Sequence, residues 1–173
     1  SVLGLTVAGD LFFSQQTPGL PDMAETDDHF GWALAAADLN QDGFDDLVIG
    51  VPDENTDTDI PVFDAGAVHL IFGSGSGLTV VGTELFVGGD STINWAPRVG
   101  DRLGASLAVG NFLQGSALDL AIGAPGSGGL GGSADAGRVA VLRDIGAGNP
   151  TLTVVAQGVG APGLSEAGDP FGG

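Results

Sequence analysis

Oxygen-bearing side chains recur at alternate positions in the nine-residue segment 38–46. They occupy positions 1, 3, 5 and 9 of the segment, and a backbone carbonyl at position 7 adds a fifth oxygen. Gly43 permits the sharp bend that such a loop requires. Ca²⁺ takes about six to eight oxygen ligands in a flexible geometry. We therefore predict a calcium site whose ligands are Asp38, Asn40, Asp42, Phe44 and Asp46.

Two features separate this loop from a helical calcium loop. No distal glutamate follows at the required position, and the flanking residues are strand-like rather than helical. Mg²⁺ would demand a smaller octahedral site that keeps more water. The alternative interpretation is an Asx-rich hairpin turn that faces solvent without an ion. Asp45 lies off the alternating pattern and is expected to face solvent.

A second loop, at residues 111–119, lies 73 residues further along and has lost this pattern. Only Asn111 and Asp119 keep oxygen-bearing side chains at the ligand positions, because Leu113 and Gly115 replace two of the others. We predict no strong metal site there. The metal is therefore expected to hold one strand connection together rather than to be required in every unit.

A further group of acidic residues follows Pro52, with Asp64 at its end as a turn residue before Gly66. One interpretation is a cation-dependent binding loop, to which the tryptophan beside Pro97 would add an exposed contact. The other is a solvated loop kept open by repulsion, with the tryptophan packed against the protein. The candidate partner-binding residues are Asp53, Glu54, Asp57, Asp59 and Trp95.

The charge of the chain is strongly negative. Its 173 residues include 22 acidic and 4 basic ones, and the net charge is −18. This argues against binding to nucleic acid or to anionic membrane surfaces, which both need Lys and Arg. No apolar run approaches the length of about 18 residues that a membrane helix needs, so no membrane insertion is expected. The acidity suits a calcium-rich exterior or a salt-adapted protein.

No set of residues predicts catalysis, so we do not expect an enzyme. The absence of cysteine removes disulfides, thiol chemistry and cysteine-bound zinc. Residues 126–131 spell a glycine-rich nucleotide motif, but a strand-like segment follows where a helix is needed. His29 and His69 have no partners placed to complete a catalytic triad, and we expect structural or exposed positions for both.

An internal repeat indicates the architecture. Segments recur at an offset of about 73 residues, and each unit contains four short strand-like runs separated by Gly, Pro, Asn and Asp. The expected strands are residues 32–37, 47–51, 66–72 and 78–87, followed by 105–110, 120–124, 137–142 and 151–157. Four strands per repeat predict an all-β fold of propeller-type blades, each a sheet of four antiparallel strands. Aromatic residues are expected to pack between blades: Phe30, Trp32, Phe44, Phe72 and Phe86.

The unit resembles the FG-GAP repeat of integrin α-subunit-type β-propellers, including bacterial members. The residues that carry the resemblance are Phe30-Gly31, the loop Asp38–Asp46, Gly50-Val51-Pro52, Gly123-Ala124-Pro125 and the linker segments Phe13–Gln15 and Pro18–Pro21. About two and a half repeats are present. We expect a partial blade with an outer strand and linker at 1–29, a repeat with the calcium loop at 30–102, a repeat with a degenerate loop at 103–170, and the start of another at 171–173.

The resemblance implies a calcium-binding, secreted or cell-surface module for adhesion or protein–protein assembly. Its partner would be a protein or glycan at the propeller face, or copies of itself. Two blades cannot close a ring, so we expect a fragment of a longer chain or several chains that complete a ring or filament. The other interpretation is a non-catalytic propeller part of a larger secreted enzyme.

Overall fold

Two antiparallel sheets make up the fold in the computed structural model, which describes residues 10–128, 136–146, 150–157 and 160–161. The strands of the first sheet are β1 (Ala33–Ala37), β2 (Asp46–Val51), β3 (Ala67–Phe72) and β4 (Thr79–Val87). Those of the second are β5 (Ser106–Gly110), β6 (Asp119–Ala124), β7 (Arg138–Arg143) and β8 (Thr151–Gln157), and a short β9 (Gly160–Ala161) pairs with β8 in parallel. In each sheet the strands lie in sequence order.

The all-β prediction is confirmed, and the strands begin and end within one residue of the expected positions. The pairing of β9 was not predicted, since two residues carry no periodicity. The described residues contain no helix, and accordingly none that is long and apolar enough to cross a membrane. The part of the expected partial blade that precedes residue 10 and the expected repeat start at 171–173 lie outside the described residues.

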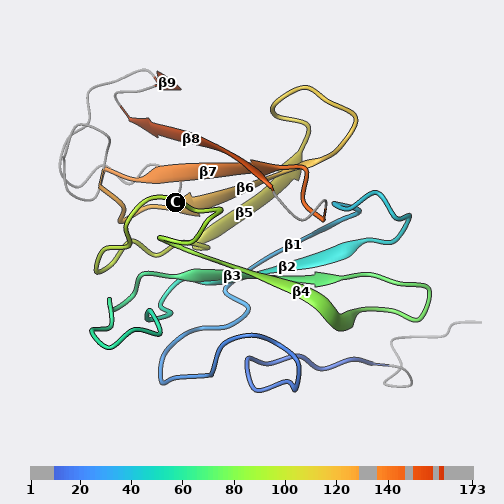
Figure 1. The fold of residues 1–173 in the computed structure, drawn as a ribbon, viewed down its shortest axis with the longest axis horizontal. Coiled ribbons are helices and arrows are strands. Elements are labelled where there is room, and N and C mark those ends of the chain that lie inside the picture. The colour runs from blue at the N-terminus through green and yellow to red at the C-terminus, as the bar shows by residue number, and fades with distance from the viewer. Residues whose placement is uncertain (1–9, 129–135, 147–149, 158–159, 162–173) are drawn as a thin grey trace, which may run out of the picture.

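The sheets lie face to face around one apolar layer (Figure 1). Val48 and Leu70 of the first sheet face this layer, as do Leu120, Ile122 and Leu142 of the second, and all five are fully buried. The other face of the first sheet packs through a smaller group that includes Ile49, Ile71 and Leu20. The central strands β2 and β3 are therefore buried on both faces, which explains their nearly unbroken apolar sequence.

The expected packing of the aromatic residues is only partly observed. Phe86 and Phe72 belong to the layer between the sheets, and Phe30 packs on the smaller group. The prediction was wrong for Trp32 and Phe44, which are 56% and 45% exposed. Trp32 precedes β1 and lies beside Arg102, with the guanidinium 5.7 Å from the ring centre, so it covers the junction of the two units from outside.

The two units meet through direct backbone contact. A Cβ added to Gly50 in β2 would lie 2.1 Å from the carbonyl oxygen of Gly104, just before β5. Next to this point, the N–H groups of Arg102 and Leu103 donate to the carbonyls of Asp64 and Ala65 at 3.0 Å. Glycine is required at Gly50 because a side chain there would push the units apart.

Replacing Gly50 with Ala is therefore expected to destabilise the protein by about 1–3 kcal/mol, since the added methyl overpacks a backbone contact. Urea unfolding monitored by tryptophan fluorescence measures the change. Gly115→Ala is the control, because the nearest atom to its Cβ is 4.0 Å away. Equal unfolding midpoints for the two variants would contradict the close contact.

His69 in β3 is fully buried, and neither ring nitrogen has a hydrogen-bond partner. Burial lowers the pKa of this imidazole from 6.5 to about 4. Between pH 6.5 and 4 this histidine is protonated in the unfolded chain but neutral in the folded chain. The free energy of unfolding therefore falls as the pH falls through this window. The loss is about 3 kcal/mol.

We expect His69→Leu to lose less stability than the unchanged protein between pH 7 and 4.5, as measured by urea unfolding at each pH. A His69→Leu profile parallel to that of the unchanged protein would show that the buried imidazole is not the cause.

Candidate functional site

The predicted calcium loop lies between β1 and β2 and is held together by side chain–backbone hydrogen bonds. The N–H groups of Asp42 and Gly43 each donate to the carboxylate of Asp38 at 3.0 Å. The N–H of Asp42 also donates to Asn40 Oδ1 at 3.0 Å, and that of Phe44 donates to Asp42 Oδ1 at 2.9 Å. These bonds bring the side chains of positions 1, 3 and 5 together at an exposed turn. Asp45 is exposed, as expected.

Asp46, at position 9, differs from the other expected ligands because it is completely buried. Its two oxygens accept from the N–H groups of Leu39 at 3.0 Å and Gly73 at 2.9 Å. Burial raises the pKa of Asp46, and these hydrogen bonds oppose the rise. Asp46 therefore ties the loop to the turn after β3, a role that the spacing alone did not indicate.

The second loop keeps the buried acid at position 9, but without a tie to a neighbouring turn among the described residues and without the rest of the ligand pattern. Asp119 Oδ2 accepts from the N–H groups of Phe112 and Leu113 at 2.7 and 2.8 Å. Asn111, the counterpart of Asp38, donates instead to the carbonyl of Gly115 at 2.7 Å. The acid at position 9 is thus a structural cap in both units, whereas the acids at positions 1 and 5 occur only in the first.

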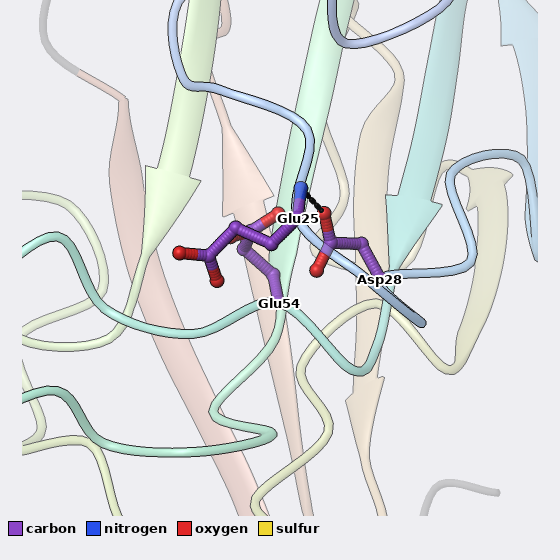
Figure 2. A group of neighbouring side chains, drawn as sticks. All are labelled: Glu25, Asp28 and Glu54. Carbon is purple, nitrogen blue, oxygen red and sulfur yellow. Dashed lines mark hydrogen bonds between the residues drawn. The ribbon is translucent and has the colours of Figure 1, made fainter.

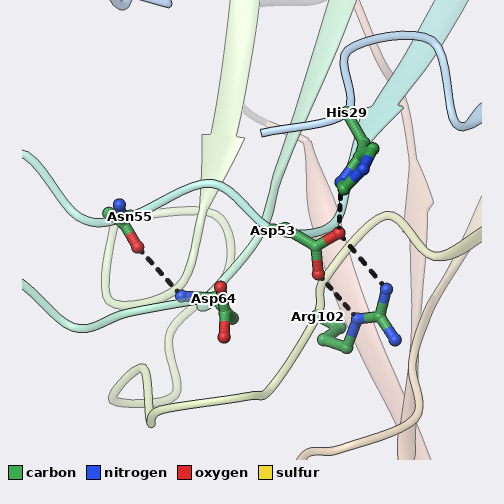
Figure 3. Close-up of polar contacts among 5 residues, drawn as sticks. All are labelled: His29, Asp53, Asn55, Asp64 and Arg102. Carbon is green, nitrogen blue, oxygen red and sulfur yellow. Dashed lines mark hydrogen bonds and ion pairs between the residues drawn. The ribbon is translucent and has the colours of Figure 1, made fainter. Parts of the chain in front are cut away.

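Asp53 and Trp95, two of the candidate partner-binding residues, make contacts within the chain. Asp53 lies 2.8 Å from His29 Nδ1 and 2.9 Å from Arg102 Nε, and so joins the first unit to the start of the second (Figure 3). Trp95 is half-buried against the apolar layer, with the guanidinium of Arg138 5.5 Å from its ring centre. These contacts engage much of both side chains.

The other candidates occupy a pocket wall and an exposed loop. A pocket of about 440 Å³ lies beside the loop after β2, and Glu54 and Asp57 are among its lining residues, together with Asp22 and Asp90. Asp59 is exposed further along the same loop. The backbone N–H of Asp64 donates to Asn55 Oδ1 at 3.0 Å, and this bond holds the two ends of the loop together (Figure 3).

Glu54 belongs to a buried acidic cluster rather than to an exposed binding face. Carboxylate oxygens of Glu25, Asp28 and Glu54 lie within 4.8 Å of one another (Figure 2). Within the described residues, this is the one group of three acidic or histidine side chains that comes so close. Gln15 Nε2 donates to Glu54, and the N–H of Glu25 donates to Asp28.

The cluster strongly favours neutralisation of its charge. Burial and then the nearby carboxylates of Asp22 and Asp28 raise the pKa of Glu54 to about 8. Burial also raises the pKa of Asp28 and of Asp22. Holding several carboxylates together in a buried site is costly unless protons or a cation compensate them.

Glu25 and Asp28 were not singled out from the sequence, because they lie in the linker before Phe30, where the acids do not follow an alternating ligand pattern. A signal did exist in the internal repeat. The offset of 73 residues aligns Glu25 with Arg98 and Asp28 with Asp101. An acid in one unit therefore takes the place of a base in the other, next to an aspartate that both units keep.

Replacing Asp46 with Asn should destabilise the protein by about 1–3 kcal/mol even in EDTA, because a buried N–H loses its carboxylate acceptor. Unfolding in urea with EDTA measures this without any contribution from calcium. Asp45→Asn removes the same charge from the neighbouring exposed position and should have little effect. Equal losses for both would mean that general charge repulsion, and not the cap, decides stability here.

Comparison with known proteins supports the assignment of the repeat. The model of the FG-GAP repeat matches residues 30–71, which hold β1, β2 and the loop between them. The phosphatidylinositol-glycan-specific phospholipases D of Homo sapiens and Bos taurus are 40% and 39% identical to this chain over 95 residues. The match covers 55% of this chain and 11% of each relative, so the chain spans at most a small part of their length.

Proposed function

We propose, from the premise that residues 30–71 are an FG-GAP repeat, that this chain is a non-catalytic, calcium-binding propeller module. Calcium would bind the loop between β1 and β2, with Asp38, Asn40, Asp42, the Phe44 carbonyl and Asp46 as ligands. The rigid sheets would then present the neighbouring loops to a protein or glycan partner, outside the cell or at its surface. The blade boundaries at 30–102 and 103–170 are part of this proposal.

The observation that carries the calcium proposal is the order of three oxygen-bearing side chains around one turn, although the carboxylates of Asp38, Asp42 and Asp46 do not all come within 4.8 Å of one another. Asp38, Asn40 and Asp42 are ordered around one exposed turn by four backbone hydrogen bonds. The proposed ligands include three carboxylates, and all of them are oxygens, which favours a hard cation. The irregular turn favours Ca²⁺ over Mg²⁺, which needs a regular octahedral site. The second loop supplies an internal contrast, because it has the same strand connection without these acids.

The loop after β2 is the best-supported partner surface. It combines the exposed acids Asp57 and Asp59 with two exposed apolar side chains, Ile60 and Phe63. Exposed apolar residues grouped with charged ones are typical of interaction sites. The strongly negative charge of the chain favours a basic partner surface.

A second candidate function is that of a non-catalytic part of a larger enzyme. The similarity to two phospholipases D, over about a tenth of their length, favours this alternative. Calcium would have the same structural role in that setting. This alternative is distinguished from an adhesion module by two findings. The module would be attached to a catalytic region, and the activity of that region would be retained when the loop 38–46 is altered.

The calcium site is tested by replacing Asp42 with Asn in the full chain. Loss of a charged ligand should weaken calcium binding on the order of tenfold or more, as measured by titration calorimetry. Calcium at 100 times its Kd should raise the free energy of unfolding of the unchanged protein by about 2.7 kcal/mol. The resulting rise in melting temperature should be smaller in the variant.

Asp45→Asn is the matched control, because it removes one charge from the same loop without touching the alternating positions. It should retain the affinity and the thermal shift. If the two variants bind calcium equally well, or if calcium changes neither the melting temperature nor protease sensitivity of the unchanged protein, the proposed role of the loop is wrong.

A further inference from the structure

The acidic cluster formed by Glu25, Asp28 and Glu54 has the features of a cation site that is separate from the loop 38–46. The linker before β1 supplies Glu25 and Asp28, and the loop after β2 supplies Glu54 (Figure 2). Asp28 and Glu54 are only 3% and 2% exposed, whereas Glu25 closes the cluster from the solvent side. Three carboxylates from two chain segments therefore converge at the edge of the protein interior.

Two buried oxygens at this cluster have no hydrogen-bond donor. Asp28 Oδ1 is one, and its carboxylate points toward the other two acids in Figure 2. The second is Asp22 Oδ2, from a side chain outside the group of three that is only 5% exposed. Asp22 interacts with Glu54 and with Asp57. A buried carboxylate oxygen without a donor lacks the compensation that such groups normally have.

The described positive groups compensate this charge only weakly, because His29 lowers the pKa of Asp28 less than burial and the neighbouring acids raise it. His69 Nε2 lies 3.9 Å from Asp22 Oδ2, but burial keeps that imidazole neutral near pH 7 by lowering its pKa to about 4. Arg102 is paired with Asp53. His29 also contacts Asp53 and is exposed. The side-chain donors that reach the cluster, Gln15 and Asn55, are uncharged, as are the backbone N–H groups of Glu25 and Asn55.

The equivalent position of the second unit shows how the same fold balances this charge. Asp101 takes the place of Asp28, and the N–H of Arg98 donates to it at 2.8 Å just as that of Glu25 donates to Asp28. Asp101 Oδ1 also lacks a hydrogen-bond donor. Burial raises the pKa of Asp101 as well, but Ser127, Arg138 and Arg98 oppose the rise. Ser127 stands where the first unit has Glu54.

We propose that Glu25, Asp28 and Glu54 bind a divalent cation, Ca²⁺, at a site distinct from the loop 38–46. The ion would supply in the first unit the positive charge that the arginines supply in the second. All the available ligands are oxygens, and Ca²⁺ accepts irregular sets of carboxylates completed by water. The adjoining pocket of about 440 Å³, which Asp22 and Glu54 also line, gives room for such waters.

The location implies a different structural effect from that of the loop site. The loop 38–46 leads into β2, whereas Glu54 follows the end of that strand. The two sites therefore lie at opposite ends of β2. Calcium at the cluster would fasten the linker, through Glu25 and Asp28, to the first sheet.

Equilibrium dialysis of the full chain against Ca²⁺ at physiological salt tests the proposal. We expect two bound ions for the unchanged protein. The double variant Glu25→Arg with Glu54→Ser installs the residues of the second unit, so it should bind one ion and melt at a higher temperature than the unchanged protein in EDTA. Glu54→Gln, nearly the same shape, is the second variant and should lose at least tenfold in affinity for one of the two ions.

The loop variant Asp42→Asn separates this proposal from that of the loop site. Loss of one ion in Asp42→Asn and of the other in the cluster variants supports both sites. Two ions in both cluster variants, or one ion in the unchanged protein that only Asp42→Asn removes, would overturn the cluster site. If Asp42→Asn keeps its full complement while the cluster variants lose one ion, the loop site fails and the cluster site stands.

Discussion

The backbone contact between Gly50 and Gly104 is the constraint on which the arrangement of the two sheets depends. With no side chain at either residue, β2 and the start of β5 approach until a carbonyl oxygen fills the space that a Cβ would need. Hydrogen bonds from residues 102 and 103 to residues 64 and 65 continue this junction. The apolar layer around Val48 and Leu120 can close only because the sheets start from this separation.

Much of the fold could be predicted because its signals are local. Short apolar runs such as Leu47–Val51 and Val68–Phe72, bounded by Gly, Pro and Asp, predict strands within one residue of β2 and β3. The order of the strands follows from the repeat. Burial of individual aromatic residues could not be predicted in the same way, because the exposure of Trp32 and the partial burial of Phe72 depend on which distant segments lie over them.

The candidate sites differ in the same way: one is contiguous in the sequence, and the other is assembled from distant segments. The loop 38–46 is contiguous, so its spacing alone places the oxygens of Asp38, Asn40 and Asp42 around one turn. The cluster of Glu25, Asp28 and Glu54 is assembled from segments about 30 residues apart, and no spacing rule joins them. Asp53 shows the opposite case. It belongs to a dense acidic segment, yet its carboxylate forms an ion pair with Arg102 at the junction of the units.

The carboxylate caps of Asp46 and Asp119 bear on how such repeats diversify. Each cap accepts from two backbone N–H groups: Asp46 from one in its own loop and one in the turn after β3, and Asp119 from two in its own loop. The second unit keeps its cap although leucine and glycine stand at positions 3 and 5 of the loop. The strand connection therefore does not depend on the acids at positions 1 and 5, because the second unit forms it with Asn111 and Gly115 there. Substitution can change the charge of such a turn without removing the cap that fixes the connection, so the turns of repeated units can diverge while their strands stay paired.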